Sequence, residues 1–220
     1  HQHVIDALRN AAVAQGANAT VITFDPHPRH VLNPGAVPVK LLSSMAEKVE
    51  LLTKAGVEHL VILPFTQELA NLSYYDFVKE FLIGKINMRG MIVGYDHRFG
   101  RNREGDFEKL KELSLEFGFY LEQGTPYSER DVNISSTKIR NALNVGDIMT
   151  AKEYLGYDYS CRGKVVKGFS NGRAIGFPTA NIELDDSNKL LPGNGVYAIL
   201  AECQGVRYKG MLDIGVRPTF

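Results

Sequence analysis

Three polar segments of the chain are placed where an open parallel β-sheet collects its ligands, beyond the carboxyl ends of its strands. The first, residues 23–28 (TFDPHP), follows an apolar run, and two prolines fix the backbone on either side of His27. An imidazole held in this way could donate a hydrogen bond to a phosphate or stack on a ring. The alternative is a proline-rich turn in which His27 is merely exposed beside Pro28.

The second segment, residues 93–101 (VGYDHRFGR), also follows a predicted strand. Its two glycines would let the backbone approach a ligand, and Asp96 and the arginines between and after them offer charge of both signs. A solvated surface loop would have the same composition. The segment therefore predicts either a binding loop or an exposed turn.

The third segment, residues 134–140 (ISSTKIR), opens a predicted helix with the hydroxyl groups of Ser135, Ser136 and Thr137. Free amide groups, the helix dipole and the cations Lys138 and Arg140 favour a phosphate at such a helix start. Serine and threonine also cap helices that bind no ligand, so a plain N-cap is the alternative. Taken together, the three segments predict a ligand site at one edge of a sheet.

A fourth run, residues 163–181 (GKVVKGFSNGRAIGFPTAN), has spaced glycines, among them Gly176, that permit tight turns in which backbone amides can surround an anion. It is not a P-loop, because no GxxxxGK[ST] pattern occurs. Thr179 and Asn181 offer neutral oxygens two residues apart, which suit Mg²⁺. A turn of a β-barrel would use many of the same residues, so both interpretations stay open.

The elements that must position these segments alternate between strands and helices over residues 1–156. The predicted helices are residues 1–16, 45–55, 75–82 and 107–117, and the predicted strands are residues 19–24, 58–63, 91–93 and 119–122. Ser44 and Glu47 form a capping box before the second helix. This alternation predicts an α/β fold with a doubly wound parallel sheet.

The character of the sequence changes after two short predicted helices, about residues 137–144 and 148–155. From residue 157 onward, β-rich pieces at 159–166, 195–202 and 207–214 are separated by glycine and proline, which predicts an antiparallel barrel or sandwich. We therefore expect a domain boundary near Gly156, with domains at residues 1–156 and 157–220.

The composition restricts the kind of partner. Lys plus Arg equals Asp plus Glu at 25 each, so no overall positive field attracts nucleic acid or an anionic membrane. Cys161 and Cys203 are too few for a disulfide framework and lie in no metal-binding pattern, which favours a reducing cytoplasm. No membrane span or signal segment is predicted. The chain opens without Met, in a predicted helix, so we expect the native protein to begin upstream.

Taken in order, these segments resemble the family of bifunctional bacterial riboflavin kinase/FMN adenylyltransferases, also called FAD synthetases. The resemblance spans essentially the whole chain, and residues 134–140 and the GFPTAN residues 176–181 carry its most specific part. Other matching pieces are TFDPHP (23–28), EKVELL (47–52), GYDHRFG (94–100), GRAIGFPTANI (172–182), GVYA (195–198) and GVRPTF (215–220).

The resemblance implies that a nucleotidyltransferase (HUP-like) domain makes FAD from FMN and ATP, and that an incomplete riboflavin-kinase barrel makes FMN from riboflavin and ATP. His1 looks like the last residue of an HxGH motif, and Arg140 would join it in stabilising the departing pyrophosphate. The other implied contacts are Ser135, Ser136 and Thr137 to ATP, His27, Pro28 and Asp96 to flavin and nucleotide, and Gly176, Thr179 and Asn181 to Mg²⁺-ATP. The family's kinase base is a later glutamate, which would follow Phe220.

Two other functions are compatible with parts of the sequence. A different nucleotidyltransferase, acting on a phosphopantetheine or nicotinamide precursor, would share the α/β domain but would have no use for GFPTAN. A flavin- or nucleotide-binding module without turnover would bind ATP tightly and form no product.

Overall fold

The computed structural model describes residues 2–95, 97–124, 128–129, 132–168, 176 and 179–215, with the backbone only at 128–129 and 132–133. Contacts divide the chain into two compact units, His1–Val39 with Met45–Asn133, and Lys40–Ser44 with Ile134–Phe220. The first unit contains, in chain order, α1 (Gln2–Ala14), β1 (Thr20–Asp25), α2 (Pro28–Leu32), α3 (Met45–Lys54), β2 (His59–Pro64), α4 (Gln67–Asn71), α5 (Tyr74–Asp76), η1 (Phe77–Ile83), β3 (Gly90–Val93), η2 (Arg101–Arg103), α6 (Phe107–Phe117), β4 (Tyr120–Gln123), β5 (Ser128–Glu129) and β6 (Val132–Asn133). The second contains α7 (Ser136–Asn144), α8 (Ile148–Leu155), β7 (Gly163–Val166), β8 (Asn181–Leu184), β9 (Gly195–Cys203) and β10 (Val206–Ile214).

The first unit is built on parallel strand pairs. β1 pairs with β2 over its whole length, from Thr20 opposite His59, and β3 pairs with β4, from Gly90 opposite Tyr120. The parallel direction agrees with the predicted β/α alternation. A single doubly wound sheet is not observed, because the described strands form separate two-stranded sheets. The alternation specifies the direction of a strand but not which neighbours it bonds to.

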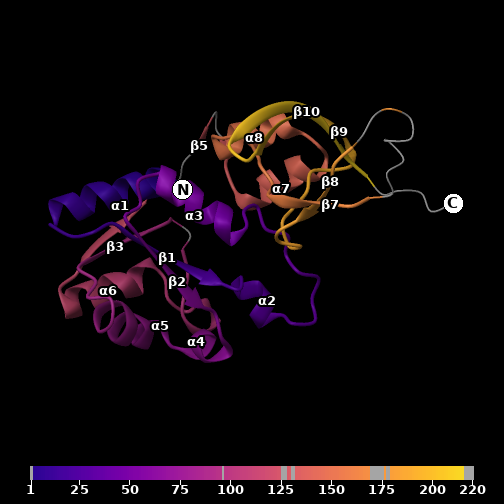
Figure 1. Ribbon diagram of the computed structural model, residues 1–220. Helices are drawn as coiled ribbons and strands as arrows, with labels where there is room; N and C mark the ends of the chain where they lie inside the picture. The colour runs from indigo at the N-terminus through magenta and orange to yellow at the C-terminus, as the bar shows by residue number, and fades with distance from the viewer. Residues whose placement is uncertain are drawn as a thin grey trace. The chain divides into compact units, whose positions relative to one another are not determined.

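Side chains from both strand pairs nevertheless meet in one hydrophobic core. Its buried members come from η1, β3, α6 and the residue before β4, namely Val78, Leu82, Val93, Leu110, Leu113 and Phe119. Ile22 of β1 packs against this cluster. Figure 1 shows β1, β2 and β3 between α1 and the helices α4–α6. The core therefore holds strands and helices in layers, as an α/β fold requires.

One helix differs from its prediction. Residues 75–82 were expected to form an α-helix, whereas the structure has a short α-helix, Tyr74–Asp76, followed by a π-helix, Phe77–Ile83. Val78 and Leu82 of the π-helix are buried, and the rings of Phe77 and Phe81 stack at 5.6 Å between centroids. Apolar residue spacing alone does not distinguish a π-helix from an α-helix of this length.

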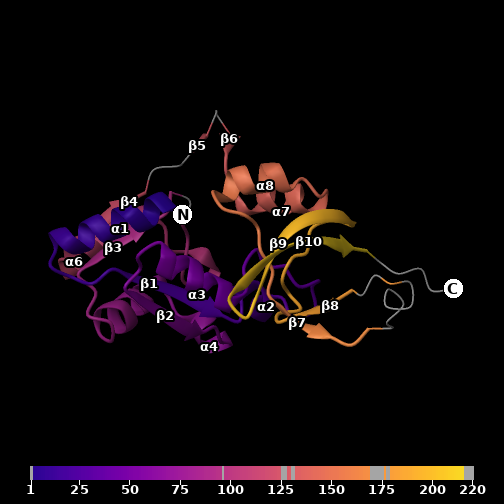
Figure 2. The same cartoon turned by 45° about the horizontal axis from the view of Figure 1, so that its top comes forward.

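The second unit combines a helix pair with antiparallel hairpins (Figures 1 and 2). β7 pairs with β8 and β9 pairs with β10, each in an antiparallel register. The two last predicted strands agree closely with β9 and β10, while the predicted strand at 159–166 is shorter and β8 was not predicted. The described strands form two separate sheets and no closed barrel.

The core of the second unit lies between its helices and the segment before β9. The buried residues are Ile139, Ala142 and Leu143 of α7, Ala151 of α8, and Leu190. Leu42, from the first half of the chain, packs against the same cluster. The compact units thus divide the chain differently from the predicted domains. The boundary between the two predicted domains, near Gly156, stays a prediction.

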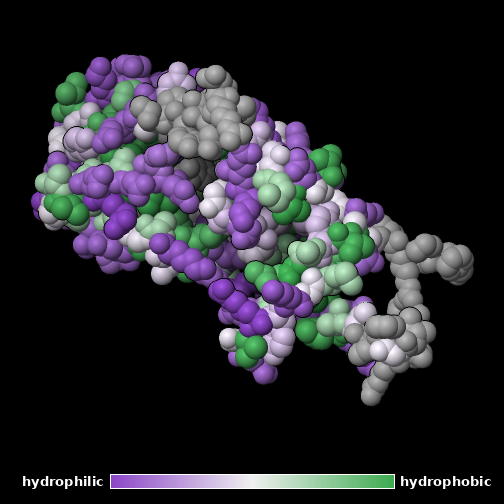
Figure 3. All heavy atoms as spheres, turned by 90° about the horizontal axis from the view of Figure 1, so that it is seen from above, coloured by the Kyte–Doolittle hydropathy of each residue, from purple (hydrophilic) through white to green (hydrophobic). Residues whose placement is uncertain are grey.

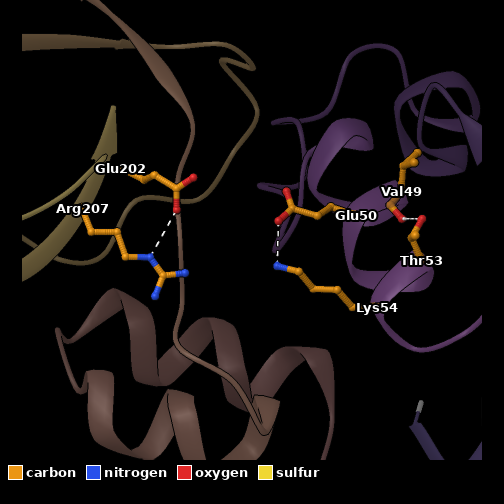
Figure 4. Close-up of polar contacts among 6 residues, drawn as sticks. All are labelled: Val49, Glu50, Thr53, Lys54, Glu202 and Arg207. Atoms are coloured by element: carbon orange, nitrogen blue, oxygen red, sulfur yellow. Dashed lines mark hydrogen bonds and ion pairs between the residues drawn. The ribbon is translucent and has the colours of Figure 1, made fainter. Parts of the chain in front are cut away.

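The surface carries exposed ion pairs and scattered apolar side chains. On α3, Lys54 and Glu50 are 2.7 Å apart and the Thr53 hydroxyl donates to the Val49 carbonyl at 2.9 Å (Figure 4). In the β9–β10 hairpin, Arg207 lies 3.4 Å from Glu202 (Figure 4). Hydrophobic and hydrophilic residues alternate over the face in Figure 3. Exposed pairs of this kind contribute little stability each.

Candidate functional site

The TFDPHP segment forms the carboxyl end of β1 and the start of α2. β1 ends at Asp25, and His27 is the N-cap of α2, with Pro28 at the first helical position. The His27 Nδ1 atom accepts a hydrogen bond from the Arg29 backbone N–H at 3.2 Å. A neutral imidazole that accepts through Nδ1 carries its proton on Nε2, the nitrogen that could donate to a phosphate. His27 is thus half-buried and oriented by its own helix.

Lys48 of α3 joins this segment, and sequence reasoning missed it. Its Nζ atom donates to the Thr23 Oγ1 atom at 2.9 Å, which brings a cation to the end of β1. Burial lowers the pKa of Lys48, and the Asp25 carboxylate partly opposes that shift. A lysine with a perturbed pKa beside the carboxyl end of a strand is a functional-site candidate. Its only sequence signal was its place in EKVELL, one of the pieces shared with the resembling family.

The GYDHRFG segment is described except for Asp96, which lies outside the described residues. The His97 and Phe99 rings stack, with 5.8 Å between centroids. Gly100 has φ 75° and ψ 175°, and a Cβ atom there would lie 2.7 Å from the Tyr74 backbone nitrogen. Gly100 is therefore required by its backbone conformation and by its close packing against Tyr74, and the predicted approach of this loop to a ligand stays a prediction. Gly94 has open space around it.

The ISSTKIR segment opens α7 as predicted. Ser135 is the N-cap, and its Oγ atom accepts from the Lys138 backbone N–H at 3.3 Å. Ser136 and Thr137 follow in the first turn, and both are exposed. Ser135 thus performs the plain capping role, while the two following hydroxyls and the helix dipole face solvent where a phosphate could bind.

Arg140 lies one turn further along α7 and is partly buried. Its Nε atom donates to the Lys40 carbonyl oxygen at 3.0 Å, which fixes the guanidinium against residues 40–44. Ser135, Ser136, Thr137 and Arg140 therefore lie together on one helix of the second unit. His27 and Pro28 belong to the first unit. His1, the other predicted catalytic residue, lies outside the described residues.

The GFPTAN segment leads into β8. Gly176 has φ 82° and is exposed, so its backbone adopts a conformation that favours glycine. Thr179 and Asn181 are exposed, and Asn181 opens β8 opposite Val166 of β7. The Asn181 side chain lies directly against Gly168, so this glycine makes room for it. That role in hairpin packing is one the glycine spacing did not predict.

The oxygens of Thr179 and Asn181 fit the ligands that Mg²⁺ prefers, and their exposure leaves room for water and phosphate oxygens. Over the described ranges, no group of three or more His, Cys, Asp or Glu side chains is placed to hold a metal ion. The Mg²⁺ site at Thr179 and Asn181 stays a prediction.

A pocket of about 200 Å³ lies elsewhere in the first unit, between α1 and the amino ends of β1 and β2. Asp6, Arg9 and Glu58 are among its lining residues, and the Glu58 Oε2 atom accepts from the Ala19 backbone N–H at 3.2 Å. Ligands of open parallel sheets bind at the opposite, carboxyl edge. This pocket is therefore separate from the predicted site. In the part of the chain that is described, no helix has the length and apolar character to cross a bilayer.

Two protein-family profiles match the chain. The profile described as FAD synthetase matches residues 1–138, and the one described as riboflavin kinase matches residues 155–220. A bifunctional riboflavin kinase/FMN adenylyltransferase of Bacillus subtilis (strain 168) is 36% identical over 221 residues, covering 100% of this chain and 69% of that protein. The protein of the same name from Escherichia coli (strain K12) is 33% identical over 222 residues, again covering 100% and 69%.

A solved structure is also similar over the whole chain. A crystal structure of a protein named for macrolide efflux, from Streptococcus pneumoniae, superposes with a TM-score of 0.89 at 32% identity, covering 100% of this chain and 71% of that one. The fold of the chain is therefore similar to one already found in a crystal.

Proposed function

Because the chain belongs to the family of bifunctional riboflavin kinase/FMN adenylyltransferases, we propose that it transfers the adenylyl group of ATP to FMN and the γ-phosphate of ATP to riboflavin. The first reaction yields FAD and pyrophosphate, and the second yields FMN. The observation that carries this proposal is the co-linear match of both family profiles to one chain. ATP, riboflavin and FMN are then the small-molecule substrates.

The adenylyl transfer needs positioned donors more than a covalent nucleophile. A phosphate oxygen of FMN attacks the α-phosphorus of ATP, and the bond from that phosphorus to the bridging oxygen breaks as pyrophosphate leaves. Ser135, Ser136, Thr137 and the first amides of α7 would bind the polyphosphate, and Arg140 with His1 would stabilise the departing charge. Exposure of the two hydroxyls at the helix start supports this assignment.

Residues at the end of β1, in the first unit, would also contact flavin or nucleotide. His27, with Nδ1 committed to its own helix, would donate from Nε2, and Pro28 would hold the backbone beside it. Asp96 would contact flavin or nucleotide. Lys48 adds a cation at the same strand end, anchored to Thr23. A nucleotidyltransferase (HUP-like) arrangement of this domain is part of the proposal, supported by the parallel pairing of its strands.

The kinase site would lie at GFPTAN. Thr179 and Asn181 would hold Mg²⁺, which supplies charge neutralisation at the ATP phosphates, and the Gly176 backbone would approach the nucleotide. The exposed oxygens at the start of β8 support this role. The hairpins β7–β8 and β9–β10 would belong to a partial riboflavin-kinase barrel. The reducing cytoplasm expected from the cysteine content remains a prediction.

The experiment that tests the proposal follows both reactions in the full-length protein. Riboflavin, ATP and Mg²⁺ are incubated with it, and FMN and FAD are separated by chromatography. Arg140→Ala should lower FAD formation on the order of a hundredfold, because one electrostatic contact to the leaving group is lost. FMN formation should stay near the wild-type rate.

The matched control is Arg207→Ala, which removes an exposed arginine paired with Glu202. It should leave both rates unchanged. Absence of FMN and FAD with the unmodified full-length protein would reject the proposed function. Equal loss of both activities in a folded Arg140→Ala protein would reject the assignment of two separate sites.

The alternatives give different outcomes in the same assays. A nucleotidyltransferase for another precursor has no need of the residues 155–220 that match riboflavin kinase. A binding module without turnover would show tight ATP binding by calorimetry and no product.

A further inference from the structure

The segment Lys40–Ser44 is separated by about 90 residues of sequence from the rest of its compact unit, yet it packs with it. Leu41 forms a parallel bridge with Lys189. The Leu41 N–H donates to the Asn188 carbonyl at 2.7 Å, and the Leu190 N–H donates to the Leu41 carbonyl at 2.8 Å. Residues 40–44, within the FAD synthetase match, are thus held by residues within the riboflavin kinase match.

Lys189 contacts the segment Lys40–Ser44 with a buried ammonium group. It is only 4% exposed, and its Nζ atom donates to the Leu42 carbonyl at 2.7 Å. The same nitrogen lies 4.2 Å from the centre of the Tyr159 ring. The Tyr159 hydroxyl in turn donates to the Leu190 carbonyl at 2.7 Å. A buried ammonium group is costly unless it is partnered in this way, so Lys189 and Tyr159 form one connected clamp on the segment.

The other end of the segment holds Arg140. The Lys40 carbonyl accepts from Arg140 Nε at 3.0 Å, and the Lys40 Nζ atom donates to the Ser187 carbonyl at 2.8 Å. Ser187, two residues before Lys189, therefore helps to hold Lys40 in place. A shift of residues 40–42 would move the carbonyl that orients the Arg140 guanidinium.

We infer that Lys189 and Tyr159 are positioning residues for Arg140, acting through Lys40–Ser44. This inference rests on the proposed function, in which Arg140 contacts the leaving pyrophosphate. Its consequence is that the rate of FAD formation depends on side chains from the part of the chain that matches riboflavin kinase. Displacements on the order of 1 Å at a reacting centre can cost as much as a hundredfold in rate.

The test measures kcat and KM for FAD formation in the full-length protein with FMN and ATP supplied directly, so kinase turnover is not needed. Lys189→Met should lower kcat on the order of tenfold with a smaller change in KM for ATP. Lys189→Arg, which can still donate and lie over the ring, should recover most of the loss. Tyr159→Phe, which keeps the ring and removes one hydrogen bond, should give a smaller drop. Lys209→Met, at an exposed lysine of β10, is the matched control and should change nothing.

The decisive comparison repeats Lys189→Met in an Arg140→Ala background. If Lys189 acts through Arg140, the second substitution causes no further loss in that background. An equal loss in both backgrounds, or no loss in the unmodified background, overturns the inference. If Lys189→Met does not fold, as judged by circular dichroism, the same cycle with Tyr159→Phe decides between these results. Failure of the unmodified protein to form FAD would refute the proposed function instead.

Discussion

A pair of leucines two residues apart in α6 offers a controlled test of the first unit's core. Leu113 is 3% exposed and belongs to the cluster with Val78, Leu82 and Val93, whereas Leu115 is 81% exposed. Leucine to alanine removes three carbon atoms, each worth about 0.8 kcal/mol when buried. With the energy of the residual cavity added, Leu113→Ala should lower the free energy of unfolding by about 2 to 5 kcal/mol.

Leu115→Ala makes the same chemical change in the same helix, but it removes almost no buried apolar surface because the Leu115 side chain is exposed. We expect its effect on the free energy of unfolding to be within about 0.5 kcal/mol. The chain has no Trp, so urea unfolding followed by far-UV circular dichroism suits both variants. Because two units can unfold separately, the transitions are fitted independently. Equal shifts for the two variants, or a larger shift for Leu115→Ala, would refute the packing described for α6.

Three further predictions address backbone conformation, pH and surface charge. Gly100→Ala should lower the free energy of unfolding by about 2 kcal/mol or more, as measured by thermal unfolding, because its φ of 75° and ψ of 175° suit only glycine and a Cβ atom would clash with Tyr74. The control Gly118→Ala, with φ 72° and open space around the position, should cost about 1 kcal/mol. Hydrogen bonds from the Thr150 side chain and then its backbone hold the pKa of Asp147 below its usual 3.8. The stability that Asp147 gives α8 is therefore complete above pH 3.8 and is lost as the pH falls through the lower folded-state pKa. Asp147→Asn, which cannot titrate, should flatten this part of an acid titration of helicity, and an unchanged curve would contradict the prediction. Arg207→Ala breaks the exposed pair with Glu202 and should change the free energy of unfolding by less than about 1 kcal/mol in urea, a larger loss being inconsistent with its exposure.

Local sequence chemistry predicted several elements well. The spacing of apolar residues predicted a helix at 107–117, and the structure has α6 at Phe107–Phe117, with Asp106 as N-cap and Gly118 in the left-handed conformation at its end. Ser135 was likewise predicted to open a helix, and it caps α7. These signals depend on residues within one turn of each other, so no distant contact was needed to interpret them.

Elements whose form depends on packing were predicted less well. The short helices α2 and α4 contain too few residues for a periodic pattern, and β8 begins at the last residue of the run 163–181, whose spaced glycines indicated tight turns. Lys48 was missed as a site candidate because its contact with Thr23 joins two elements 25 residues apart. A lysine in an amphipathic helix gives no local sign of such a partner.

The sequence by itself determined the chemistry available to this protein: hydroxyls and cations at the start of one helix, a histidine between prolines after a strand, and a Thr/Asn pair after a glycine, in an order that resembles one enzyme family. Only the tertiary structure decided that the strands of the first unit bond as separate pairs and that Lys40–Ser44 packs with the second unit. It also decided that Lys189 is buried against Leu42, 147 residues away. The physical reason is range, because capping and turn preferences act between neighbours, whereas strand pairing and the burial of a charge are fixed by partners that only the folded chain brings together.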